Sequence, residues 1–143
     1  MFISTALISV PMRKIIIDTN FLMIPIQFRV DIFSEIDRIC NFNYKLCIYE
    51  NSIGELKNII EKQSGKSKKA AQFALKLIEL KNIGTIQSKL KDVDSLILEN
   101  ISKDMIVATQ DIYLKKQLLE KGVSVIILRQ KKYLQLVERK LYK

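Results

Sequence analysis

The chain has 143 residues, enough for one domain with one core, and its 48% apolar and 27% charged residues are typical of globular proteins. It contains no histidine, which excludes His-based general bases, Ser-His and Cys-His nucleophile pairs, and nearly all zinc sites. The formal charge of +9, from 24 Lys and Arg against 15 Asp and Glu, indicates either nucleic-acid binding through phosphate contacts or a merely lysine-rich surface.

The ends and the cysteines place further limits. No apolar run reaches the roughly 18 residues that span a bilayer, so we expect no membrane segment. The first ten residues, MFISTALISV, lack the basic start and the A-x-A site of a signal peptide. We interpret residues 1–12 as an N-terminal extension or an upstream start, and residues 13–143 as one domain. Cys40 and Cys47 lie in apolar surroundings, which predicts buried thiols in a reducing, cytoplasmic location.

Strands and helices are expected to alternate along the chain. In order, we predict a strand at 14–18, a helix at 29–39, a strand at 44–49, and helices at 51–63 and 70–80 joined by a basic turn at 64–69. There follow a short strand at 84–88, a helix at 92–101, a strand at 105–109, a helix at 112–122 ended by Gly122, a strand at 123–128 and a helical basic tail. The pattern predicts an α/β fold, a three-layer α/β/α sandwich with a central, mainly parallel, five-stranded sheet.

Acidic residues stand where predicted strands end and helices begin. Asp18 ends the first strand, Asp111 follows the strand at 105–109, Asp94 opens a helix and Glu55 lies early in another. Ligands bind at the carboxyl ends of parallel strands, so these carboxylates are expected to meet at one sheet edge. Carboxylates that close repel one another, and a hard cation such as Mg²⁺ or Mn²⁺ resolves the repulsion.

Each acid also has a purely structural interpretation. Asp18 and Asp111 are candidate helix caps, Asp92 and Asp94 are first-turn acids that a helix dipole favours, and a lone helical acid such as Glu55 is usually solvated. Capping and metal binding are compatible roles. The occurrence of four such acids together in an alternating chain favours the metal site.

Four blocks of the sequence resemble the PIN domain family: KIIIDTNFLMIPIQFRVDIFSEID, IGELKNI, VDSLIL and IVATQDIYLKKQLLEKGVSVIIL. They extend from about Lys14 to Leu134 and are similar to the archaeal branch near VapC toxins and the ribosomal-RNA-processing nuclease Fcf1. The resemblance implies an endoribonuclease dependent on one or two Mg²⁺ or Mn²⁺ ions. Its role would be that of a toxin with an antitoxin partner, or of a nuclease in rRNA processing, and it would form a homodimer.

The resemblance also assigns roles to the acids. Asp18 matches the first family acid in DTN, Glu55 the second, Asp94 the third and Asp111 the fourth in ATxD, all with catalytic and metal-binding roles. The expected main ligands are Asp18 and Asp111, while Asp94 would bind the same or a second ion. Glu55 would hold an outer-sphere water or the second ion.

Neighbouring positions match the family less uniformly. Asn20 and Thr109 match polar positions that support the pocket. Ser95 stands where the branch often has a second Asp, and Gln110 where Asn is more usual.

The family chemistry needs no histidine, because the ion activates a bound water and neutralises charge on the phosphate. Basic residues must then hold RNA around an acidic pocket. The candidates, each of which alone also fits a solvated face, are Arg29, Lys57, Lys66, Lys68, Lys69, Arg129, Lys131 and Lys132. Tyr113 is a candidate for stacking on a base, although core packing is the expected role.

Two other hypotheses remain open at the sequence level. A catalytically silent PIN-like RNA-binding module in ribosome assembly would keep the fold and the charge without needing the acids. A phosphotransfer domain also places Asp at a strand end. However, Asn20 stands where a haloacid dehalogenase needs a second acid, and RKIII lacks the acidic pair of a receiver domain.

Overall fold

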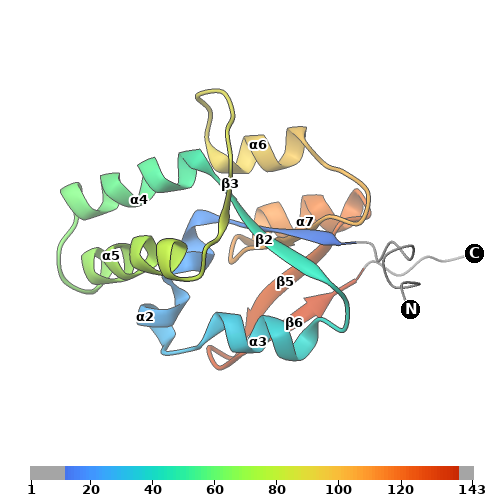
Figure 1. The fold of residues 1–143 in the computed structure, drawn as a ribbon, viewed down its shortest axis with the longest axis horizontal. Coiled ribbons are helices and arrows are strands. Elements are labelled where there is room, and N and C mark those ends of the chain that lie inside the picture. The colour runs from blue at the N-terminus through green and yellow to red at the C-terminus, as the bar shows by residue number, and fades with distance from the viewer. Residues whose placement is uncertain (1–11, 139–143) are drawn as a thin grey trace, which may run out of the picture.

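The computed structural model describes residues 12–138, and these build one six-stranded sheet with the order β3-β2-β1-β4-β5-β6 (Figure 1). The strands are β1 (Arg13–Ile17), β2 (Tyr44–Tyr49), β3 (Gly84–Ile86), β4 (Ile106–Ala108), β5 (Ser124–Arg129) and β6 (Tyr133–Val137). The first five are parallel, and β6 alone runs antiparallel to its neighbour β5. Parallel pairing requires crossover connections, which the helices supply.

The helices cover both faces of the sheet. They are the 3₁₀ helix η1 (Thr19–Met23) and the α-helices α2 (Ile24–Phe28), α3 (Ile32–Ile39), α4 (Glu50–Lys62), α5 (Gly65–Leu80), α6 (Val93–Glu99) and α7 (Ile112–Glu120). Alternate residues of β1 point to opposite faces, so that Ile15 and Ile17 pack with η1 and α2–α5, while Ile16 packs with α6 and α7. Figure 1 shows α4 and α5 side by side, with α6 and α7 apart from them.

The predicted fold class is confirmed: an α/β fold with a mainly parallel sheet between two helical layers. The expected number of strands was wrong, because the basic tail predicted as a helix contains β6. Leu134 of this strand is 1% exposed, whereas Tyr133 and Gln135 on either side of it are exposed. This alternation in YLQLV is the period of a strand rather than of a helix.

The segment 64–69 is also not a turn, since α5 begins at Gly65 and carries the three lysines of that segment in its first turns. Ala70, Ala71 and Ala74 of α5 are fully buried, which anchors the helix against the core. The small alanines allow α5 to pack closely beside α4.

Several other expectations concern local features. Cys40 and Cys47 are buried thiols without a disulfide, as predicted, and burial raises the pKa of Cys40 to about 11. Residues 1–11, which we interpreted together with Met12 as an extension, lie outside the described part of the chain. Met12 itself is exposed. In the described part of the chain, none of the helices has the length and apolar character needed to span a membrane.

The edge strand β6 is held by an ion pair on α3. The backbone N–H of Leu134 donates to Glu35 Oε1 at 2.9 Å, and Arg38 Nη2 donates to the Leu134 carbonyl at 3.1 Å. Arg38 also pairs with Glu35 Oε1 at 2.9 Å. Because these side chains satisfy backbone groups on the outer side of β6, they fix the strand and blunt the sheet edge.

We therefore predict that Glu35→Ala lowers the free energy of unfolding by about 1–2 kcal/mol, since it leaves the Leu134 N–H without its acceptor. Glu99→Ala is the control, because Glu99 pairs with Lys91 while both side chains are about half exposed, and it should cost no more than about 0.5 kcal/mol. Urea unfolding measures both values. Equal costs for the two variants would contradict the role given to Glu35.

Candidate active site

A cavity of about 350 Å³ opens at the carboxyl ends of β1 and β4, in the centre of the sheet. The four acids singled out from the sequence all line it, although they come from four separate segments of the chain. The full lining is Asp18, Thr19, Asn20, Met23, Glu55, Asn58, Ile59, Asp92, Val93, Asp94 and Asp111. This lining contains no lysine or arginine, so the carboxylates face one another without a cation of the protein.

Backbone pairing sets the position of the first acid. β1 lies beside β4 with Ile17 opposite Ala108, and the N–H of Asp18 continues this ladder by donating to the Ala108 carbonyl at 2.9 Å. Thr109 continues the next ladder, its N–H donating to the Ile126 carbonyl at 3.2 Å. The residues after both strands are therefore fixed side by side before any side-chain contact is considered.

Asp18 is 4% exposed and held by two hydrogen bonds. Its Oδ1 accepts from the Thr19 N–H at 2.8 Å, and its Oδ2 accepts from the Thr109 hydroxyl at 2.7 Å. Burial raises the pKa of Asp18 above its ordinary value, and the nearby charges of Glu55 and Asp111 act in the same direction, while both hydrogen bonds oppose the shift. Asp18 thus caps η1 and faces the cavity at once, so its two sequence interpretations coexist.

The Thr109 hydroxyl joins two of the acids. It donates to Asp18 Oδ2 and accepts from the backbone N–H of Asp111 at 3.0 Å. Asp111 in turn caps α7, its Oδ1 accepting from the N–H groups of Tyr113 and Leu114 at 2.8 and 3.1 Å. Because these capping hydrogen bonds use only Oδ1 of Asp111, they leave its Oδ2 available to accept from or bind a group in the cavity.

Glu55 is half-buried and oriented by a chain of hydroxyls. The Thr19 hydroxyl donates to Glu55 Oε1 and lies 2.8 Å from the buried Ser52 hydroxyl. Since Thr19 has only one hydroxyl proton, Ser52 must be the donor in the second contact. Glu55 is therefore not the solvated surface acid of the alternative interpretation, and Thr19 and Ser52 are supporting residues that the sequence analysis did not identify.

At the start of α6, Asp92 caps the helix, whereas Asp94 makes no capping hydrogen bond and lines the cavity. Asp92 is the cap, its Oδ2 accepting from the Ser95 N–H at 3.0 Å and its Oδ1 from the Ser95 hydroxyl at 2.9 Å. These hydrogen bonds hold the pKa of Asp92 below its usual range. Asp94 is half-buried instead, and burial together with the charges of Asp18 and Asp111 raises its pKa to about 6. Asp is a preferred residue directly before a helix, so the sequence already contained this capping signal.

Gln110 ties together the loops that follow β1 and β4. Its Nε2 donates to the Asn20 carbonyl at 2.9 Å, and its backbone N–H lies 3.4 Å from Asn20 Oδ1. Asn20 lines the cavity. The Gln110 side chain thus spans between the two loops.

The chemistry of the cavity fits a hard divalent cation, because five of its eleven lining residues are acids and none is a lysine or arginine. As the side chains lie, no three His, Cys, Asp or Glu residues between 12 and 138 form a ready-made ligand cluster. Mutual repulsion favours such separation, and a bound cation would remove it. The ligand roles of Asp18, Glu55, Asp94 and Asp111 remain predictions.

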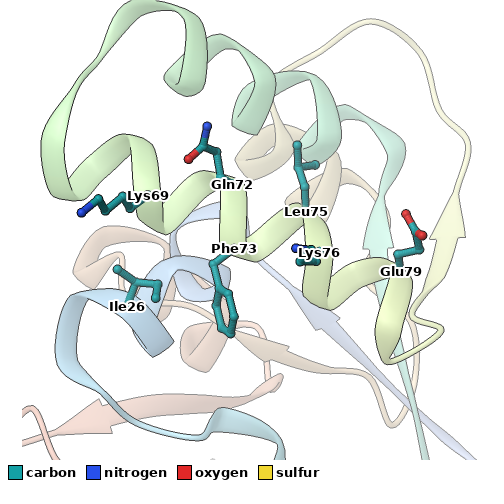
Figure 2. A pocket seen from close by; sticks show the side chains of 7 residues that line it. All are labelled: Ile26, Lys69, Gln72, Phe73, Leu75, Lys76 and Glu79. Atoms are coloured by element: carbon teal, nitrogen blue, oxygen red, sulfur yellow. The ribbon is translucent and has the colours of Figure 1, made fainter.

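The basic residues singled out from the sequence fall into several places. Lys69 lines a separate hollow of about 580 Å³ between α5 and α2, together with Phe73 and Ile26. Figure 2 shows these side chains on the two helices. Arg29 lines another hollow beside Phe33, and Lys57 is exposed on α4 near Glu55. The remaining candidates are exposed, Lys66 and Lys68 on α5, and Arg129, Lys131 and Lys132 around the β5–β6 turn.

The sequence predicted that Tyr113 packs in the core, and this was wrong. The side chain is 82% exposed at the start of α7. The reason is the turn of the helix: the buried positions of α7 are Leu114 and Leu118, which are four residues apart on one face. Tyr113 lies off this face.

We predict that Asp94 titrates near pH 6 without added metal, and that Asp111→Asn lowers this pKa because it removes a neighbouring negative charge. A pKa above the value of about 3.9 in an unfolded chain means that the folded state binds more protons between about pH 4 and 6, so stability falls as pH rises through this window. Carboxyl NMR titration measures the pKa. Asp37→Asn, an exposed acid outside the cavity lining, is the control, and an unchanged Asp94 pKa in Asp111→Asn would contradict the coupling.

Comparisons with known proteins agree with this architecture. Residues 15–131 match the family described as "PIN like domain". Ribonuclease VapC4 of Methanocaldococcus jannaschii is 32% identical over 128 residues, which cover 87% of this chain and 97% of the relative. The PIN domain endonuclease Utp24 has a similar fold, with a TM-score of 0.69 at 21% identity over 90% of this chain and 92% of that structure.

A second solved structure, a domain of a functionally unknown protein from M. jannaschii, matches with a TM-score of 0.52 at 15% identity, covering 91% of this chain and 96% of that one. At these identities the two structures support the fold alone. The family match, which spans most of the chain, and the identity to the ribonuclease lead to one conclusion: the chain belongs to the PIN-like domain family.

Proposed function

We propose that this protein is a metal-dependent endoribonuclease that hydrolyses phosphodiester bonds of RNA. The observation that carries the proposal is the cavity in which Asp18, Glu55, Asp94 and Asp111 meet without a protein cation. The relative named as a ribonuclease, at 32% identity over nearly its whole length, supports the same activity.

The acids would hold one or two Mg²⁺ or Mn²⁺ ions, with Asp18 and Asp111 as the main ligands, Asp94 on the same or a second ion, and Glu55 on a bound water or the second ion. When bound, such an ion supplies an activated water and neutralises charge on the phosphate. The chain itself supplies orientation. Thr109 holds Asp18 and the backbone of Asp111, and Thr19 holds Glu55, so hydrogen bonds limit the orientations of these residues before a phosphate arrives.

The raised pKa of Asp94 fits this role. Burial and, after it, the charges of neighbouring acids make the charged form of Asp94 costly, and a bound cation would offset both costs. A catalytically silent RNA-binding module would have no use for an arrangement that destabilises charged acids. The presence of all four acids in one cavity therefore favours the enzyme over the silent module.

We predict that the purified protein cleaves RNA in Mn²⁺ or Mg²⁺, that EDTA abolishes cleavage, and that Asp18→Asn lowers the rate by at least about a hundredfold, since it removes a main ligand charge. Glu55→Gln should lower it less, by about tenfold or more, because Glu55 is expected to act through water or a second ion. The rates are followed on a labelled RNA by gel.

The controls are the matched variants Asp37→Asn and Glu61→Gln, both of exposed acids outside the cavity, the second on the same helix as Glu55. They should cleave like the wild type. RNA binding without cleavage in every divalent metal would support the silent module, and cleavage by Asp18→Asn at the wild-type rate would refute the assignment of the site.

Between the two cellular roles, we propose a toxin rather than a nuclease of rRNA processing. The VapC relative covers the chain at 32% identity, whereas the Utp24 structure, at 21%, bears on the fold. A toxin of this kind would form a homodimer and would be blocked at the cavity by an antitoxin chain.

If the chain is a toxin, its induced expression in a bacterial host should arrest growth, because it would cleave essential RNA. Asp18→Asn should abolish the arrest and Asp37→Asn should keep it. Growth curves and RNA gels measure the effect. Normal growth with soluble, nuclease-active protein would favour the processing role instead.

A further inference from the structure

We propose that a groove beside the acidic cavity binds the RNA segment next to the phosphate that is cleaved; this inference rests on the proposed function. The groove has a volume of about 440 Å³ and runs between the start of α7 and the turn that joins β5 to β6. Asp111 lines both the groove and the acidic cavity, so the two adjoin at this residue. A strand that passes over Asp111 on leaving the cavity would reach the groove next.

The groove has the composition that a single RNA strand needs. Three cationic side chains line it, Lys115 of α7 with Arg129 and Lys131 of the hairpin, while Asp111 is its only acid. Phe28 and Ile127 add apolar surface. Positive charge follows the phosphates of a single strand, and apolar surface receives sugars and bases.

Ile112 supports the same assignment. It lines the groove and is 79% exposed, directly after Asp111 at the start of α7. The neighbouring Tyr113 is exposed as well. An exposed aromatic ring beside a basic groove offers a face on which an RNA base stacks, and an exposed aliphatic side chain offers apolar contact.

The turn of the hairpin holds Lys131 in an uncommon backbone conformation. Gln130 and Lys131 have φ values of 51° and 57°, and the Lys132 N–H donates to the Arg129 carbonyl at 2.9 Å. This geometry is that of a two-residue turn with both central residues left-handed, which usually contains Asn-Gly or Asp-Gly. Lys131 thus occupies a position where glycine is preferred, and it lines the groove.

The hairpin is also braced, so the basic residues have a fixed platform. Arg129 Nε donates to Gln135 Oε1 at 2.6 Å across the two strands. The ion pair of Glu35 and Arg38 on α3 holds the other side of β6 at Leu134. By contrast, Lys69 on α5 lines a hollow that shares no residue with the acidic cavity (Figure 2).

The test measures binding of a fluorescein-labelled single-stranded RNA to the Asp18→Asn protein, which should not cut it. Adding Lys115→Gln or Lys131→Gly should weaken binding several-fold, and each should lower the slope of log affinity against log salt by about 0.7, the share of one phosphate contact. The same lysine variants in the wild-type background should raise KM for cleavage more than they lower kcat.

Two matched controls separate charge from folding. Lys116→Gln removes an exposed lysine next to Lys115 that does not line the groove, and should leave affinity and salt slope unchanged. Asn82→Gly is the control for backbone strain, because Asn82 is an exposed residue with a φ of 52° that does not line the groove. Both glycine variants should keep or raise the Tm, because glycine adopts positive φ freely, but only Lys131→Gly should lose RNA.

Equal affinities for the lysine variants and their controls would overturn the groove, as would a wild-type groove that binds no RNA. Failure of the nuclease is a distinct result: groove-dependent binding would persist while the wild type cleaves nothing in any divalent metal.

Discussion

The candidate site depends on two hydrogen bonds of the Thr109 hydroxyl. It donates to Asp18 and accepts from the backbone of Asp111, so it joins the residues that follow two neighbouring parallel strands. Strand register brings these residues close, and the hydroxyl fixes the remaining freedom of the Asp18 side chain. A valine of similar volume would fill the same buried space but would leave the Asp18 oxygen without its donor. The pairing of β1 and β4 therefore places the site residues, and side-chain hydrogen bonds then orient them.

The net charge of the whole chain is positive, whereas the charge of the cavity lining is negative. The chain carries a formal +9, yet the lining of the cavity in its centre holds five carboxylates and no basic side chain. Burial and, after it, the neighbouring carboxylates raise the pKa values of Asp18 and Asp94. Natural proteins keep such unfavourable clusters mainly at functional sites. The left-handed Gln130 and Lys131 break a second local rule within the groove that adjoins the cavity.

The sequence predicted those features that depend on pattern and strand direction. Asp18 and Asp111 were found because acids after apolar strands must lie at one sheet edge, and Asp94 and Glu55 through their places in the following helices. β6 was missed because flanking lysines hid the alternation in YLQLV, and its turn lacks an Asn-Gly signal. The hydroxyl chain of Thr19 and Ser52 joins residues far apart in sequence, and no periodicity reveals such a contact. Lys115 was missed because the groove that it lines forms only where α7 lies beside the β5–β6 turn, and the sequence does not reveal this packing.

The same electrostatics link the site to the stability of the fold. Asp18 is almost fully buried and its pKa is raised mainly by that burial, so its charged form destabilises the native state. Asp94 contributes in the same direction. Any group that binds both carboxylates only in the folded chain stabilises it by mass action and also cancels part of this repulsion. A cation in this cavity would therefore act as a structural ligand as well as a chemical one, and substitutions that neutralise the acids should make the fold more stable while they remove the chemistry.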